Sequence, residues 1–172
     1  GRLDPERPPS YLEVSHKAVN RPVTIKNQYS EKYSAGGDNG VVNGIRGTID
    51  FHDGNWQGYE GVDFEAIIDL GATTVISEIR SSFLQNQSAW IFFPTEVEFE
   101  ISADGFDYRS VKRFQHKTEI SPGHEVIDFS HVFFQEKVRF VKVKAKNITI
   151  CPDWHPGAGG KAWIFVDEIV VK

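Results

Sequence analysis

Residues 96–102 read EVEFEIS and residues 141–146 read VKVKAK. In the first stretch, Val97, Phe99 and Ile101 fall on one face, and three glutamates fall on the other. The second stretch alternates apolar residues with lysines in the same way. A period of two residues is typical of a strand with one buried face, so both stretches are predicted strands.

Four further stretches resemble these strands in composition, at residues 64–70, 75–80, 124–129 and 163–171. Residues 102–105 (SADG) predict a turn between strands, and residues 30–35, before Gly36 and Gly37, are the only plausible helical turn. Short strands separated by frequent turn signals predict an all-β sandwich or jelly roll.

Composition agrees with one β-rich domain. The chain has 172 residues, with 13 Phe, five Tyr, four Trp and 15 Gly, a mixture that favours strands and turns. The net charge of −5 argues against a nucleic-acid module and against adhesion to anionic lipid. The single Cys151 excludes an internal disulfide, and no apolar run reaches the length of a bilayer span.

The chain divides into a short linker and one domain. Residues 1–12 contain three prolines and four charged residues without periodicity, which is typical of a linker, and residues 13–172 show no second break in composition. The chain opens on Gly1 and contains no Met, so we expect it to be a piece of a longer or processed polypeptide.

Three stretches break the alternation and contain all four tryptophans: residues 52–61 (HDGNWQGYEG), 84–94 (LQNQSAWIFFP) and 151–163 (CPDWHPGAGGKAW). In a sandwich, the loops at one end usually carry the function. These three stretches are therefore the predicted functional loops.

From residue 14 to residue 172 the sequence resembles the discoidin, or coagulation factor 5/8 type C, domains. The stretches that carry the resemblance are VVNGIRGT (41–48), NWQGYEGVDFEAIIDLG (55–71), FLQ and WIFFPTEVEFEISADG (83–105), and WIFVDEIVVK (163–172). Members that bind sugars form carbohydrate-binding module family 32. GIRGT, WQGYEG and CPDWHPGAGGKAWIF are most similar to the C-terminal domain of chitobiases, β-N-acetylhexosaminidases of glycoside hydrolase family 20 in gut Bacteroidetes.

The resemblance implies an eight-stranded jelly roll of the galactose-binding-domain type and a non-catalytic carbohydrate-binding module. It also implies a glycan and the parent chain's catalytic domain as partners, with no nucleic acid and no membrane insertion. The isolated domain is expected to be a monomer. The parent protein is expected to be exported to the periplasm, the outer membrane surface or the medium.

The resemblance also implies a structural calcium ion. The corresponding ligands are the carbonyls of Gly40, Ile45 and Asp167, the amide oxygen of Asn43, the hydroxyl and carbonyl of Thr48, and the carboxylate of Glu168. Oxygen ligands of these kinds suit a hard cation. Asn43 stands where the family usually has Asp, which leaves Glu168 as the one formal charge and predicts weak binding. The alternative interpretation is a plain turn at Asn43-Gly44 and a solvated Glu168.

A sugar site needs a flat aromatic face and short polar side chains. Trp56, Trp90 and Trp154 are the candidate platforms. The candidate hydrogen-bonding residues in the same stretches are Gln57, Gln85, Asn86, Asp153, His155 and Lys161. The alternative interpretation is that these tryptophans are partly buried anchors of their loops. Trp163, at the start of a predicted strand, is expected in the core.

The sequence gives little support to catalysis. Asp50, Asp53, Glu60 and Asp63 are the only clustered carboxylates in a loop, and glycosidases need two carboxylates across a cleft. Cys151 lacks a nucleophile motif. Two further functions stay open: a discoidin-like module that binds protein or phospholipid surfaces, and a structural domain that packs on its catalytic partner.

Overall fold

A computed structural model describes residues 12–172, so the predicted linker lies outside the described residues except for Leu12. Within residues 12–172 there are seven strands, one fewer than the eight that the resemblance implies: β1 (Val23–Ile25), β2 (Gln57–Glu60), β3 (Phe64–Asn86), β4 (Glu96–Ser102), β5 (Arg109–Gln115), β6 (His124–Lys146) and β7 (Trp163–Val171). Three short 3-10 helices join them: η2 (Glu31–Tyr33), η3 (Asp38–Val41) and η4 (Gln87–Ala89). Within residues 12–172 no helix is long and apolar enough to cross a membrane.

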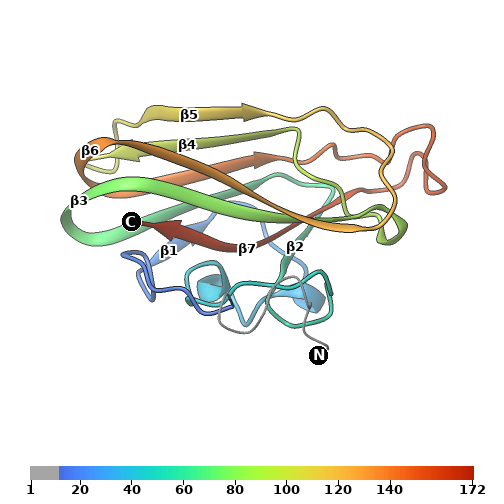
Figure 1. The fold of residues 1–172 in the computed structure, drawn as a ribbon, viewed down its shortest axis with the longest axis horizontal. Coiled ribbons are helices and arrows are strands. Elements are labelled where there is room, and N and C mark those ends of the chain that lie inside the picture. The colour runs from blue at the N-terminus through green and yellow to red at the C-terminus, as the bar shows by residue number, and fades with distance from the viewer. Residues whose placement is uncertain (1–11) are drawn as a thin grey trace.

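The strands form an antiparallel jelly-roll sandwich whose two layers share β3 and β6. The N-terminal half of β3 pairs with β1 and with the C-terminal half of β6, which continues to β4 and β5. In the other layer, the C-terminal half of β3 pairs with the N-terminal half of β6. On its other edge, this half of β3 pairs with β7, and β7 pairs with β2. Figure 1 shows both long strands turning back at the end of the molecule opposite the loops.

The predicted all-β sandwich is confirmed. The predicted strands at 96–102 and 163–171 coincide with β4 and β7, and the predicted helical turn contains η2. The predicted strands at 64–70 and 75–80 are halves of one strand, β3, which bends where the register shifts between Asp69 and Thr74. Gly71, with a φ of 87°, supplies the left-handed backbone at this bend.

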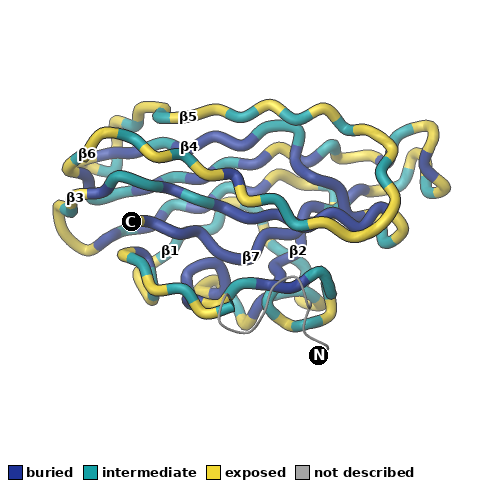
Figure 2. The backbone as a smooth tube through the Cα atoms, viewed as in Figure 1, coloured by how far each residue is buried: buried dark blue, intermediate teal, exposed yellow. Residues whose placement is uncertain are grey.

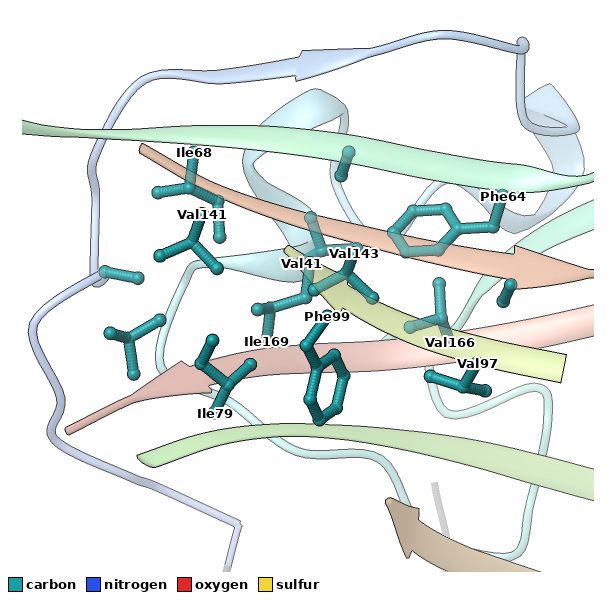
Figure 3. Close-up of a cluster of buried hydrophobic side chains, with 14 of the residues drawn as sticks. Val41, Phe64, Ile68, Ile79, Val97, Phe99, Val141, Val143, Val166 and Ile169 are labelled. Carbon is teal, nitrogen blue, oxygen red and sulfur yellow. The ribbon is translucent and has the colours of Figure 1, made fainter. Parts of the chain in front are cut away.

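The main core lies between the two layers. Phe64 and Ile68 from β3 meet Phe99 from β4 and Ile169 from β7 (Figure 3), and all four are at most 1% exposed. These are the apolar positions of the alternating stretches. The burial of β4's apolar face therefore follows directly from its period of two residues.

A second apolar cluster lies on the outer face of the layer that contains β7. Trp56, Leu84, Ile91 and Phe165 form its buried centre, and Tyr33, Phe51 and Trp163 pack against it. Because loops cover this outer face, β7 is buried on both sides along nearly its whole length (Figure 2). This accounts for the apolar residues on both sides of Asp167 and Glu168 in its sequence, WIFVDEIVV.

Candidate functional site

Three loops meet at one end of the sandwich: residues 87–95, 116–123 and 147–162 (Figure 1). The Gln87 side chain joins the first two, because its amide donates to Glu119 O at 2.8 Å and accepts from Ser121 N at 3.1 Å. The His155 ring joins the third, with Nε2 2.6 Å from Gln87 O. Buried hydrogen bonds thus fix the loops relative to one another.

Trp90 occupies the centre of this loop cluster in an unusual conformation. Its φ of 66° and ψ of 22° are left-handed, which is rare for a bulky residue. The indole lies directly against Gly157 and Gly160, where a β-carbon would come within 2.5 and 2.7 Å of the ring. It is still 39% exposed. Strained backbone of this kind is a feature of functional sites, and here it presents an aromatic ring to solvent.

A hollow of about 350 Å³ lies between Trp90 and Trp154, which is 41% exposed. We call it the first hollow. Its other lining residues include the apolar Ile120 and Pro156, the hydroxyl-bearing Ser88 and Ser121, and the polar Gln87 and His155. The volume lies within the range of small-ligand sites, and aromatic faces beside hydroxyl groups are suited to a sugar ring.

The structure brings Trp90, Trp154 and His155 of the predicted site together around this hollow. His155 is only 6% exposed and its ring nitrogens already have partners. Nδ1 accepts a hydrogen bond from Gly157 N at 2.9 Å, so Nε2 is the donor to Gln87 O. His155 therefore holds the loops and has no ring nitrogen left for a sugar hydroxyl.

Three other predicted polar residues are also buried and have structural partners. Gln85 Oε1 accepts from Phe93 N, Asn86 Oδ1 caps η4 through Ala89 N, and Gln57 Nε2 donates to Gly37 O. Each is at most 5% exposed. Their expected role in direct sugar binding is therefore corrected to one of positioning the loops.

Trp56 needs the same correction. It is 1% exposed, its ring lies against Gly47, and its indole N–H donates to Thr48 O at 2.7 Å. A buried ring has no face for a ligand, so the alternative interpretation, a loop anchor, describes Trp56. Trp163 is half-buried in the second apolar cluster rather than in the main core.

Asp153 and Lys161 are exposed and lie outside the lining of the first hollow. Sequence reasoning did not identify Ser88 or the 120–123 segment (ISPG) as part of the site. No aromatic or charged residue marks that segment; only its Pro-Gly turn signal was present. The 120–123 segment is brought to the site by Gln87, whose side chain accepts a hydrogen bond from the N–H of Ser121, 34 residues away.

The expected metal ligands lie around the buried Glu168. A β-bulge, in which Asp167 and Glu168 oppose Ser82, places the two acidic residues. Glu168 Oε2 accepts from Gly44 N at 2.7 Å and lies 2.7 Å from His16 Nε2, whereas Oε1 is buried without a hydrogen-bond partner. Burial raises the pKa of Glu168 to about 9. Burial also lowers the pKa of His16 to about 4.

These residues fit a cation only in part. Oε1 of Glu168 has no hydrogen-bond partner, and it would be a hard ligand for a cation once the carboxyl, whose pKa burial raises, has lost its proton. Thr48, in contrast, donates its hydroxyl to Asp53, and its carbonyl accepts from Trp56. Asn43 Oδ1 accepts from Ile45 N at 3.0 Å, which makes a local turn. Gly40 is buried in η3. Among the described residues no three His, Cys, Asp or Glu side chains gather in a manner suited to a metal.

Three of the four clustered loop carboxylates accept hydrogen bonds from backbone N–H groups. Asp53 accepts from Thr48 N at 2.7 Å, Asp50 accepts from His52 N at 2.9 Å, and Asp63 accepts from Asn147 N at 2.9 Å. Glu60 is exposed at the end of β2. No carboxylate lies in the described lining of the first hollow. Asp50 and Asp53 therefore hold the backbone of their own loop through these hydrogen bonds, and Asp63 holds that of a segment distant in the sequence.

No protein-family model and no curated protein matches this sequence. Solved structures share its fold. Chitosan-binding module 1 of a chitosanase/glucanase from Paenibacillus sp. IK-5 has a TM-score of 0.57 at 13% identity, over 92% of this chain and 98% of that one. The Clostridium perfringens family 32 module CpGH89CBM32-4, in complex with GlcNAc-α-1,4-galactose, also has a TM-score of 0.57 at 13% identity, over 92% and 94%.

A second Clostridium perfringens module, CpGH89CBM32-5, in complex with GalNAc-β-1,3-galactose, has a TM-score of 0.53 at 18% identity. That match covers 88% of this chain and 94% of the module. The chain therefore has the all-β jelly-roll fold of family 32 carbohydrate-binding modules. At these identities the likeness concerns the fold.

Proposed function

We propose that this domain is a non-catalytic carbohydrate-binding module of a larger, exported glycoside hydrolase. The observation that carries the proposal is the first hollow, where two exposed tryptophans face a cavity that also contains serine hydroxyls. Neighbours of the same fold were solved with glycans, which supports this choice of ligand class. The parent enzyme that we propose is of the chitobiase type.

The proposed ligand is a terminal N-acetylhexosamine or a galactose-type sugar. Stacking on Trp90 or Trp154 covers the apolar face of a sugar ring. The Ser88 hydroxyl donates to Asn86 Oδ1 and can accept a hydrogen bond from a sugar hydroxyl, and Ser121 offers a second hydroxyl in the same lining. Ile120 and Pro156 add an apolar wall, which suits the methyl group of an acetamido substituent. Few atoms are contacted, so we expect a dissociation constant of about 0.1–1 mM.

A structural calcium ion, weakly held, is also part of the proposal. The support for it is the buried Oε1 of Glu168, which lacks a hydrogen-bond partner. A cation there would join the 43–45 turn to β7, far along the chain from it. Because Thr48 has other partners, we propose fewer protein ligands than the resemblance implies.

The alternative of a surface-binding module rests on exposed apolar residues near the loops. Ile120 is 69% exposed and Ile150 is 55% exposed. Asp153 stands beside Trp154 in the same loop, and a carboxylate there disfavours anionic lipid. We therefore treat binding to a protein or lipid surface as an outcome of the tests rather than as a second proposal.

The test of the proposal is Trp154→Ala in a sugar titration. Loss of this exposed ring should remove detectable binding and leave the melting temperature nearly unchanged. Phe134→Ala is the matched control, because Phe134 is 92% exposed on β6 and lies outside the lining of the hollow. Unchanged affinity in Trp154→Ala would contradict the proposed site.

A further inference from the structure

A second hollow adjoins the first one and shares part of its lining. It has a volume of about 390 Å³ and shares Trp90 and Ser88 with the first hollow. Its own walls include Tyr33, Phe51, Trp163 and Phe165. Trp90 and Ser88 therefore form a wall that the two cavities share.

The second hollow is formed before any ligand arrives. Its rings hold one another edge to face: the Tyr33 centroid lies 5.6 Å from that of Trp163, and the Phe51 centroid lies 5.9 Å from that of Phe165. Tyr33 also lies 5.0 Å from Phe165. Phe165 is a buried residue of β7, so the sheet itself supports this aromatic box.

The hollows continue in series rather than standing apart. Tyr33 and Phe51 also line a third hollow of about 290 Å³, next to His52. The surface therefore offers a run of adjoining cavities with aromatic walls, from Trp154 through Trp90 to Phe51. A single ring sugar needs only one of these cavities, whereas a linear glycan can occupy neighbouring ones.

We propose that the site takes a glycan chain of at least two sugars, one in each hollow, with Trp90 between them. This inference rests on the proposed function and specifies its ligand as an oligosaccharide segment. Neighbouring sugars of one chain are linked directly, and the two hollows are adjacent and share a wall. Two linked sugars can therefore occupy the two hollows at the same time.

Affinity should then depend on chain length. Once the first sugar is bound, the second sugar is held at a high effective concentration beside its hollow. A further aromatic contact of this kind makes a disaccharide about tenfold tighter than its monosaccharide. A site with one hollow predicts little gain, because the second sugar would project into water.

The four tryptophans provide a test within the unmodified protein. Trp154 lines only the first hollow, Trp163 only the second, and Trp90 lines both. Trp56 is 1% exposed and lines only the third hollow. The probes are N-acetylglucosamine against chitobiose, and galactose against GalNAc-β-1,3-galactose. The disaccharide of at least one pair should shift the indole N–H signal of Trp163 as well as that of Trp154, whereas its monosaccharide should shift Trp154 without Trp163.

Tyr33→Ala is the variant that tests the second hollow. It should cancel the gain in affinity with chain length and keep monosaccharide affinity, whereas Trp154→Ala should remove detectable binding of both the monosaccharide and the disaccharide. If Tyr33→Ala is unstable, the Trp163 signal of the unmodified protein decides the question. Disaccharides that bind no tighter and leave Trp163 unmoved would overturn this inference and leave the proposed function standing. If no sugar moves any indole, both fail.

Discussion

The contact between Gly157 and Trp90 offers a direct test of how the site is built. A β-carbon on Gly157 would lie 2.5 Å from Cζ2 and 2.6 Å from Cε2 of the indole. Carbon atoms in good contact are about 3.5–4.0 Å apart, so Gly157→Ala must displace the ring by about 1 Å. The tryptophan is part of the wall of both hollows, and both therefore change shape.

The cost should appear in binding more than in stability. Overpacking in a closed core costs about 1–3 kcal/mol, but Trp90 is 39% exposed and can swing outward, so we expect the lower end of that range. A lost stacking contact is worth about 1 kcal/mol, which weakens sugar binding about fivefold. The assay is a sugar titration followed by the indole N–H signals, together with thermal melting.

Gly159→Ala is the matched control in the same loop. Gly159 has a φ of 82°, so alanine strains the backbone there, but no atom lies within 4 Å of the added carbon. This variant should lose stability and keep its affinity. If Gly157→Ala leaves both the affinity and the Trp90 signal unchanged, the position of that ring does not determine the site.

Three further predictions concern the rest of the molecule. Calcium should raise the melting temperature modestly, because it binds the folded state, and Glu168→Gln should cancel this rise. Equal melting curves in chelator and in millimolar calcium would exclude the ion. Trp56→Phe leaves the buried carbonyl of Thr48 without its hydrogen-bond donor, so the free energy of unfolding in urea should fall by about 1–3 kcal/mol while sugar affinity is retained. A loss of sugar affinity without a loss of stability would show that Trp56 takes part in binding. The Arg139 guanidinium lowers the pKa of Asp69 below its usual 3.8, so this ion pair stabilises the fold above that pH and is lost as the pH falls through the lower folded value. Asp69→Asn should therefore cost about 0.5–1 kcal/mol at pH 7 and progressively less as the pH is lowered below 3.8, and a cost that does not change with pH would refute the pairing.

The sequence predicted the sandwich because its signal is local. The alternation in 96–102 contains the information that buries Phe99, and β4 has the predicted bounds. The continuity of β3 was not predictable in this way, since Gly71 reads as a break between strands. Only the pairing of both halves with β6 shows a single bent strand.

The candidate site was predicted in its loops and only partly in its residues. Trp56 and Trp90 are both tryptophans of irregular segments, yet one packs on Gly47 inside the protein and the other faces solvent. That difference depends on tertiary packing: Trp56 lies against Gly47, whereas Trp90 lies against Gly157 and Gly160, which are far along the chain. Likewise, the partner that occupies Glu168 is His16, 152 residues away.

The most direct test of the central claim is a titration of the protein with N-acetylglucosamine, N-acetylgalactosamine, galactose and chitobiose, followed by the four indole N–H signals. The account predicts that at least one sugar shifts Trp90 and Trp154 with a dissociation constant of about 0.1–1 mM, while the buried Trp56 stays still. If none of the four signals moves at tens of millimolar sugar, the partner is not a simple glycan, and the role of a protein-binding or domain-packing module takes its place.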